Sequence, residues 1–133
     1  MLVAGVVEAC VFVSGPTVTT SVYQLNSFWV GGASFDFSSD CRCFGRVKIA
    51  LTPGFYINSV DCSGFTTAHH ADTQGHFALQ LNRTYYYVAQ LINQNGTVFL
   101  QSPESSFLTG SAPTPTETPT VTPTDTPTPT PTP

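Results

Sequence analysis

The sequence has very few charged residues. Of its 133 residues, 4 are Lys or Arg and 8 are Asp or Glu, so that 9% of the chain is charged and the formal net charge is −4. An average soluble domain carries about 25% charged residues. Binding to a nucleic-acid backbone needs a basic stripe, and binding to an anionic membrane surface needs a basic helical face. We therefore expect no nucleic acid as a partner and no membrane insertion.

Groups suited to catalysis are correspondingly scarce. Asp61 and Asp72 could supply the two carboxylates of a glycoside hydrolase. The nearby histidines His69, His70 and His76 could bind a metal together with Asp72. One aspartate lies in a strand and the other in a turn, however, and the histidines lack a diagnostic ligand spacing. Structural roles are favoured for all of them, and we predict no enzyme, no cofactor and no metal site.

The chain also lacks helical periodicity and any apolar run long enough to span a membrane. Its longest apolar segment, residues 1–13, is interrupted only by Glu8 and has no basic region in front of it. It is a poor signal peptide, and it is too short to cross a bilayer. We expect a buried strand here. The alternative is a strand donated to a neighbouring copy, because an apolar strand that completes another sheet is one way to build filaments.

The C-terminal segment, residues 111–133, has a composition unlike the rest. It contains 8 Pro and 10 Thr among 23 residues, in a Thr-X-Thr-Pro repeat whose X positions include Glu117, Val121 and Asp125. Proline fixes φ and cannot donate a backbone hydrogen bond, and the residue before it is held extended. We therefore expect a polyproline II tail of about 70 Å.

Two functions suit such a tail. It could be a stiff spacer, or it could be a scaffold for O-linked sugar, since dense Thr with Pro is typical of O-glycosylated stalks. The candidate O-glycosylation sites are the threonines at even positions: Thr114, Thr116, Thr118, Thr120, Thr122, Thr124, Thr126, Thr128, Thr130 and Thr132.

The preceding part, residues 1–110, is rich in strand signals. Arg46 and Lys48 alternate with Val47, Ile49 and Leu51, which places the cations toward water and the aliphatic side chains toward a core. A second alternation runs over residues 76–81, and residues 85–92 form a β-branched and aromatic run. Gly-Pro at 15–16, Gly-Gly at 31–32, Pro-Gly at 53–54 and Asn-Gly at 95–96 predict turns, the last one a hairpin. The pattern predicts an all-β antiparallel sandwich.

Four cysteines predict disulfides. Cys41 and Cys43 are two residues apart, so on a strand both point to one face. We expect one of them to bond to Cys10 and the other to Cys62, although the sequence leaves the pairing open. A zinc site is disfavoured because the spacing is Cys-x-Cys with isolated partners. Disulfides indicate an oxidising compartment, and we therefore expect an extracellular or cell-surface location.

The second half of this region resembles a known family. Residues 44–110 resemble the carboxypeptidase-regulatory-like, or prealbumin-like, sandwich module, in which a Gly-x-Val strand, a Val-rich strand, an Asp-x-x-Gly turn and a Tyr-x-Val strand follow one another. The matching segments here are Gly45–Val47, Val60–Gly64, Thr66–Thr67, Asp72–Leu81 and Tyr86–Ala89. The resemblance implies an Ig-like or prealbumin-like sandwich with a structural or adhesive role and no catalytic residues. The Thr-Pro tail resembles those of secreted bacterial surface proteins, and the combination resembles subunits of glycan-coated extracellular fibrils.

Aromatic residues and sequons add candidate sugar sites. Exposed rings at Trp29, Tyr85, Tyr86 and Tyr87 could stack on sugar faces, although core or interface roles are favoured for them. The candidate N-glycosylation sites, in Asn-x-Thr sequons, are Asn82 and Asn95.

The sequence thus predicts an extracellular structural subunit that assembles with copies of itself into a fibre or surface layer. Its body would be a disulfide-bonded sandwich over residues 1–110, and its tail, residues 111–133, would carry covalent glycan. The alternative is a carbohydrate-binding or regulatory module, tethered by a Pro-Thr linker to a larger secreted enzyme.

Overall fold

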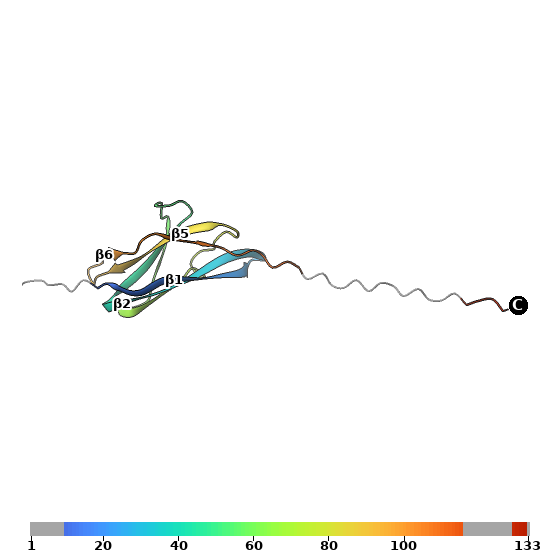
Figure 1. The fold of residues 1–133 in the computed structure, drawn as a ribbon, viewed down its shortest axis with the longest axis horizontal. Coiled ribbons are helices and arrows are strands. Elements are labelled where there is room, and N and C mark those ends of the chain that lie inside the picture. Colours follow the sequence, from blue (N-terminus) through green and yellow to red (C-terminus); the bar gives the residue numbers. More distant parts are fainter. Residues whose placement is uncertain (1–9, 116–128, 133) are drawn as a thin grey trace, which may run out of the picture.

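All regular structure in the described part of this protein is β. The computed structural model describes residues 10–115 and 129–132, and these contain seven strands and no helix (Figure 1). Every strand pair is antiparallel, and all seven strands join in one hydrogen-bonded sheet. The strands are β1 (Phe12–Leu25), β2 (Phe28–Ala50), β3 (Asn58–Asp61), β4 (Thr66–Asp72), β5 (Thr84–Ile92), β6 (Val98–Gln101) and β7 (Ser105–Leu108). The predicted all-β class is confirmed, and the expectations for residues 1–9 and 116–128 lie outside the described residues.

The long strand β2 organises the sheet. It has 23 residues and pairs with four other strands. Its first half lies between β1 and β4, and its second half lies between β3 and β5. Strands β6 and β7 both pair with β5. Strand β2 therefore belongs both to the group with β1 and β4 and to the group with β3, β5, β6 and β7, and it connects the two groups.

The core lies between the side chains of these two groups. Phe35 on the first half of β2 contacts Tyr87 on β5 and Phe107 on β7, with ring centroids 5.0 and 5.7 Å apart. Farther along β2, Val47 and Ile49 are buried, whereas the alternating Arg46 and Lys48 are only partly covered, as the period-2 pattern predicts. Ala50, which the pattern places toward water, is buried as well.

Two predicted turns are wrong, and the first of them, Gly15–Pro16, lies inside β1. Gly31 and Gly32 lie inside β2, not in a turn. At Gly32, a β-carbon would come within 2.6 Å of the Ser21 hydroxyl, so a larger residue would have to displace side chains of β1 there. The reversal between β1 and β2 occurs instead at Asn26 and Ser27, whose φ angles are +50° and +69°. Two successive positive φ angles are typical of the hairpin turn that matches strand twist.

The segment predicted as a strand over residues 76–81 is not one. Only Leu79 in it bridges to another segment, through paired backbone hydrogen bonds to Gly31. Leu79 is buried and its neighbours Ala78 and Gln80 are exposed, so the alternation reflects burial without a continuous ladder. The turn in front of it forms as predicted: the carboxylate of Asp72 accepts the backbone N–H of Gln74, and Gly75 has a φ of +91°.

The Asn95–Gly96 signal does mark a hairpin, between β5 and β6, but the loop is longer than two residues. The backbone N–H of Asn93 bonds to the carbonyl of Thr97, and the Asn93 side chain accepts two further backbone N–H groups. Gly96 has a φ of +82°. The side chain of Asn93, which no sequence signal indicated, therefore shapes this loop.

Cys10 and Gly110 lie near opposite ends of the β1–β2 hairpin. Cys10 lies at the open end, beside Cys41. Gly110 lies near the turn end, where a β-carbon on it would contact Val22. Twelve residues of extended chain separate Cys10 from Val22, which corresponds to roughly 40 Å. In Figure 1 the tail accordingly leaves the body on the side opposite the start of β1.

Replacing Phe35 by alanine should destabilise the fold strongly. Its ring is fully buried against Tyr87 and Phe107, and removing it leaves a cavity. We expect the free energy of unfolding, measured by urea denaturation, to fall by about 3–5 kcal/mol. Phe55→Ala is the matched control, because Phe55 is 72% exposed and its loss should cost less than about 0.5 kcal/mol. Equal effects of the two substitutions would contradict this core.

Candidate functional surfaces

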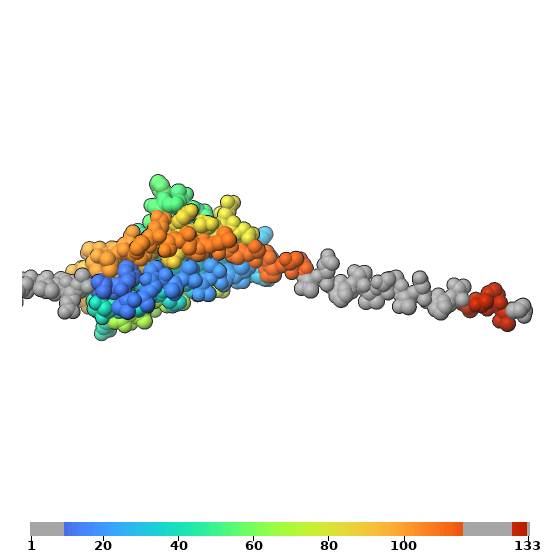
Figure 2. All heavy atoms as spheres, viewed as in Figure 1, coloured from blue at the N-terminus to red at the C-terminus, as the bar shows by residue number. Residues whose placement is uncertain are grey.

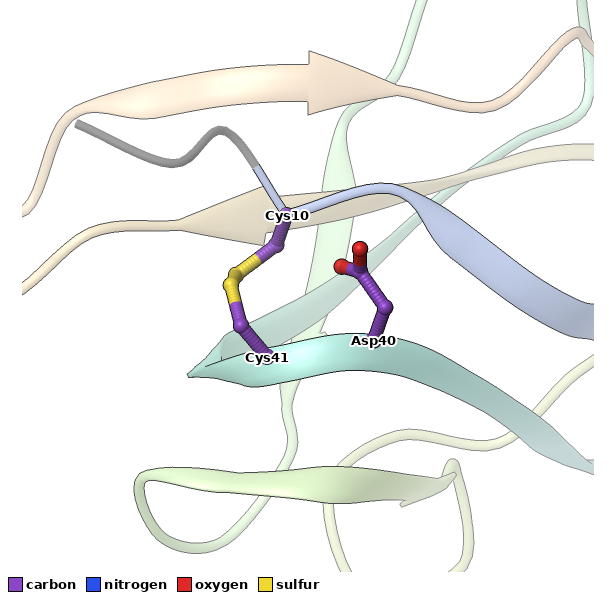
Figure 3. Close-up of side chains that lie close together, drawn as sticks. All are labelled: Cys10, Asp40 and Cys41. Carbon is purple, nitrogen blue, oxygen red and sulfur yellow. A yellow bond between two sulfur atoms is a disulfide. The ribbon is translucent and has the colours of Figure 1, made fainter. Parts of the chain in front are cut away.

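A disulfide anchors the start of the described chain to β2. Cys10 bonds to Cys41, and the backbone N–H of Val11 donates to the carboxylate of Asp40 at 2.8 Å (Figure 3). In the described residues, Cys10, Asp40 and Cys41 are also the one group in which three possible metal-ligand atoms lie close together. The two sulfurs are bonded to each other, so this group acts as a structural brace.

The second predicted disulfide is absent, which corrects the sequence expectation. Cys43 and Cys62 are free thiols, and both are buried. Cys62 lies opposite Gly45 in the β2–β3 register, so it stands diagonally to Cys43 and not directly across from it. Burial, with the nearby Asp61 carboxylate, raises the pKa of Cys62 to about 12, so this thiol stays protonated and is a poor nucleophile.

A buried histidine on β4 lies beside the other thiol. His69 stacks on Phe37 with centroids 4.9 Å apart, and its Nε2 is 2.9 Å from the Ser39 hydroxyl and 3.6 Å from the Cys43 sulfur. Its Nδ1 is buried and has no hydrogen-bond partner. Burial lowers the pKa of His69, so the ring is neutral at physiological pH and serves as a polar part of the core.

The next residue, His70, points to the opposite face. Its Nδ1 lies 2.7 Å from the carboxylate of Asp36, and both side chains are more than half exposed. They line a shallow pocket of about 270 Å³ together with Ser14 and Ser38, whose hydroxyls bond to each other instead of to the imidazole. An exposed contact of this kind contributes at most about 1 kcal/mol.

The histidines and aspartates considered from sequence are not brought together into one cluster in the described part of the chain. His69 and His70 face opposite sides of β4, and His76 lies exposed in the following turn. Asp72 caps its own turn, and Asp61 pairs with Arg46 at 2.6 Å. Each group thus has a local structural partner or faces water.

Two of the four candidate sugar-stacking rings are buried, so this prediction is wrong for them. Tyr85 and Tyr87 are 5% and 4% exposed, because alternate residues of β5 face the core. The hydroxyl of Tyr85 accepts the backbone N–H of Gln80 at 2.7 Å. Trp29 is 40% exposed and Tyr86 is half-buried, so only these two present surface.

The candidate glycosylation sites that the structure describes are exposed. Asn82 and Asn95 both lie in turns, and Thr114, Thr130 and Thr132 are open to solvent. The other seven threonines of the repeat lie outside the described residues. Glycosylation therefore stays a prediction at all of these positions.

Exposed apolar side chains form two projections that sequence reasoning missed. The loop between β2 and β3 exposes Phe55 and Ile57 by 72% and 79%, and it protrudes from the body in Figure 2. Glu104 braces it by accepting the backbone N–H of Gly54. At the β1–β2 turn, Phe28 is 74% exposed. The available signal was the position of these residues directly beside turn residues, where no core can cover them.

Comparison with known proteins does not assign this chain to a family: no family model, no curated protein and no solved structure matches it. Within the described residues there is also no helix that is long and apolar enough to cross a membrane.

The stability of the protein should fall as the pH drops through the range in which histidine titrates. Burial lowers the pKa of folded His69, whereas the unfolded ring titrates near its ordinary value of ~6.5. The unfolded state therefore takes up a proton first, and acid favours it. We expect the free energy of unfolding to be lower at about pH 5.5 than at about pH 7.5, by up to about 1.4 kcal/mol per unit of pKa shift.

Two single variants isolate this contribution. His76 is exposed, so His76→Asn should keep the pH dependence measured by urea denaturation. His69→Asn removes the buried imidazole and should weaken that dependence, whatever its effect on absolute stability. An unchanged pH dependence in His69→Asn would show that other groups cause it.

Proposed function

We propose that this protein is an extracellular structural subunit that assembles with copies of itself into a fibre or a cell-surface layer. The observation that carries the proposal is the position of the chain at the two ends of the body. Cys10 is held by Cys41 at one end, and Gly110 lies beside Val22 near the other. A unit whose chain enters and leaves at opposite ends suits arrangement in a row.

The composition of the tail supports the same function. Eighteen of residues 111–133 are Thr or Pro, a composition that favours an extended chain over a packed domain. We propose a polyproline II stalk with O-linked glycan on its threonines. Such a stalk begins at the turn end of the hairpin and would hold glycan away from the body.

The surface of the body favours association. Few charges mean weak electrostatic repulsion between copies. Large apolar side chains are exposed at both projections, including Phe28, Phe55 and Ile57. A surface of this kind is unfavourable for a dilute monomer and suits one that is covered in an assembly.

The arrangement of the strands supports a structural role. We propose that the two groups of strands form an Ig-like, prealbumin-like sandwich, because Phe35, Tyr87 and Phe107 join them across the core and the Asp72–Gly75 turn forms as the resemblance implies. A module of this kind provides a stable scaffold and needs no catalytic residue.

The alternative of a carbohydrate-binding module has lost part of its basis. It rests on Trp29 and Tyr86, since Tyr85 and Tyr87 are buried. A stacking platform needs several exposed rings close together, whereas Trp29 lies near the start of β2 and Tyr86 pairs with Ala50 at its end. Binding to a sugar array that is lost in Trp29→Ala would favour this alternative.

The full-length protein should assemble at high concentration, and salt should affect this little. Apolar contacts drive the association, and screening has few charges to act on. We expect large, elongated species in analytical ultracentrifugation and electron microscopy, with similar amounts from about 0.05 to about 1 M NaCl. A chain that stays monomeric at every concentration would refute the proposed assembly.

This 133-residue chain, when it is produced in its native source, should be heavier than its bare mass of 14.2 kDa. Chemical deglycosylation should return the intact mass to that value, because the added mass would be O-linked to the tail threonines. A variant with Asn82→Gln and Asn95→Gln should keep the added mass, and a variant without residues 111–133 should lose it. A native mass equal to that of the bare chain would remove the glycan from the proposal.

A further inference from the structure

We propose that the open edge of β1, residues 17–25, accepts residues 1–9 of a second copy as an added strand. This inference rests on the proposed assembly and names the contact that would build it. The geometry of the described residues identifies the acceptor edge. The composition of the segment in front of Cys10 identifies the donor strand. Burial, register and charge support this pairing.

Strand β1 is the longest edge strand among the described residues. It has 14 residues and pairs with β2 alone, and none of the loop backbone hydrogen bonds of the described chain reaches residues 17–25. From Thr17 to Leu25 the register with β2 is continuous, after irregularities at Ser14 and Thr17. The backbone groups on the outer side of this stretch are therefore available for a ladder.

Natural proteins usually protect such an edge. Lysine, proline, bulges or inward-pointing charges on the strand prevent pairing with another chain. Residues 17–25, Thr-Val-Thr-Thr-Ser-Val-Tyr-Gln-Leu, include no charged residue and no proline. The bulge and Pro16 lie just before this stretch, so they limit the ladder at one end and leave the remainder unprotected.

The inner face of this edge is incompletely covered. Val18, Thr20 and Val22 lie opposite Phe35, Ala33 and Gly31 of β2, so all three share the face that is directed toward the core. Val18 and Val22 are only half-buried, and Thr20 is exposed, although Phe35 and Ala33 are buried. An additional strand with apolar side chains on that face would cover the two valines.

Residues 1–9 have the composition for this position. In the sequence Met-Leu-Val-Ala-Gly-Val-Val-Glu-Ala, the odd positions are all apolar or glycine, and Glu8 is at an even position. In an added strand, Val3 and Val7 would share one face and Glu8 would be on the other. These nine residues are enough to pair with the whole open stretch of β1, which also has nine residues.

The disulfide favours a second copy over the same chain. Cys10 is bonded to Cys41, and the carbonyl of Val11 accepts the backbone N–H of Asp40, so the chain at Cys10 is already aligned along β2. The acceptor stretch begins seven positions later and extends toward the opposite end of the hairpin. Donation from copy to copy is then heterologous, and a heterologous contact that does not close into a ring produces a filament.

Four variants of the full-length chain test the contact, in matched pairs. Val7→Asp places a charge on the inner face of the donor, and Val6→Asp places it on the outer face. Thr20→Lys places a charge on the inner face of the acceptor, and Thr19→Lys, opposite Ser34, places it on the outer face. Thr19 and Thr20 are both exposed, so neither substitution disturbs the core.

We expect Val7→Asp and Thr20→Lys each to raise the concentration needed for assembly roughly tenfold or more, because each would bury an unpaired charge. The outer-face variants should assemble more nearly like the parent. The decisive measurement is a mixture. Val7→Asp keeps an intact acceptor and Thr20→Lys keeps an intact donor, so mixing the two monomers should give a two-chain complex by light scattering.

The possible failures are distinguishable. If the parent forms fibres and both inner-face variants do so equally well, the strand contact is wrong and the proposed function stands. If the variants are monomeric and their mixture stays monomeric too, the donor and acceptor are not complementary and the contact is likewise wrong. If the parent itself never assembles, the proposed function is wrong, and the contact falls with it.

Discussion

The fold depends on the register of β2. This strand buries Phe35, Phe37, Val47 and Ile49 on alternate positions, and it pairs with four other strands while doing so. Because side chains alternate with a period of two, a register slip of one residue would expose all four side chains to water. Each such side chain contributes about 1.5–3 kcal/mol by its burial, so the register is strongly specified. The remaining strands are positioned by a ladder that has only one favourable alignment.

The disulfide extends this constraint to the start of the chain. It closes a loop of 31 residues, which is worth about 3–4 kcal/mol when the restriction acts on the unfolded chain. It also holds Cys10 at the open end of the β1–β2 hairpin. The contact between Gly110 and Val22 has the same consequence for the tail at the other end. These two contacts therefore place Cys10 and the start of the tail at opposite ends of the body.

Sequence reasoning predicted the features that depend on local chemistry. The alternation at residues 46–49 gave the correct buried face, and the Asp72 carboxylate and Gly75 form the expected turn. It failed where a distant segment decides. Gly31 and Gly32 look like a turn, but Leu79 and Thr109 approach one of them and Ser21 the other, and both stay in a strand. Cys62 is free because Gly45, not Cys43, lies opposite it.

The candidate surfaces were harder to predict for a related reason. A run of three tyrosines cannot reveal which rings face the core until β7 places Phe107 against Tyr85 and Tyr87. Likewise, no sequence pattern indicated that Val18 and Val22 are only half-covered, which the structure explains because β1 pairs with β2 alone among the described residues. The scarcity of charge links these observations. A lysine on the inner face of β1, for example at the exposed position of Thr20, would protect the edge at little cost to the fold. A surface that omits this inexpensive protection is better suited to being covered by another chain than to remaining in water.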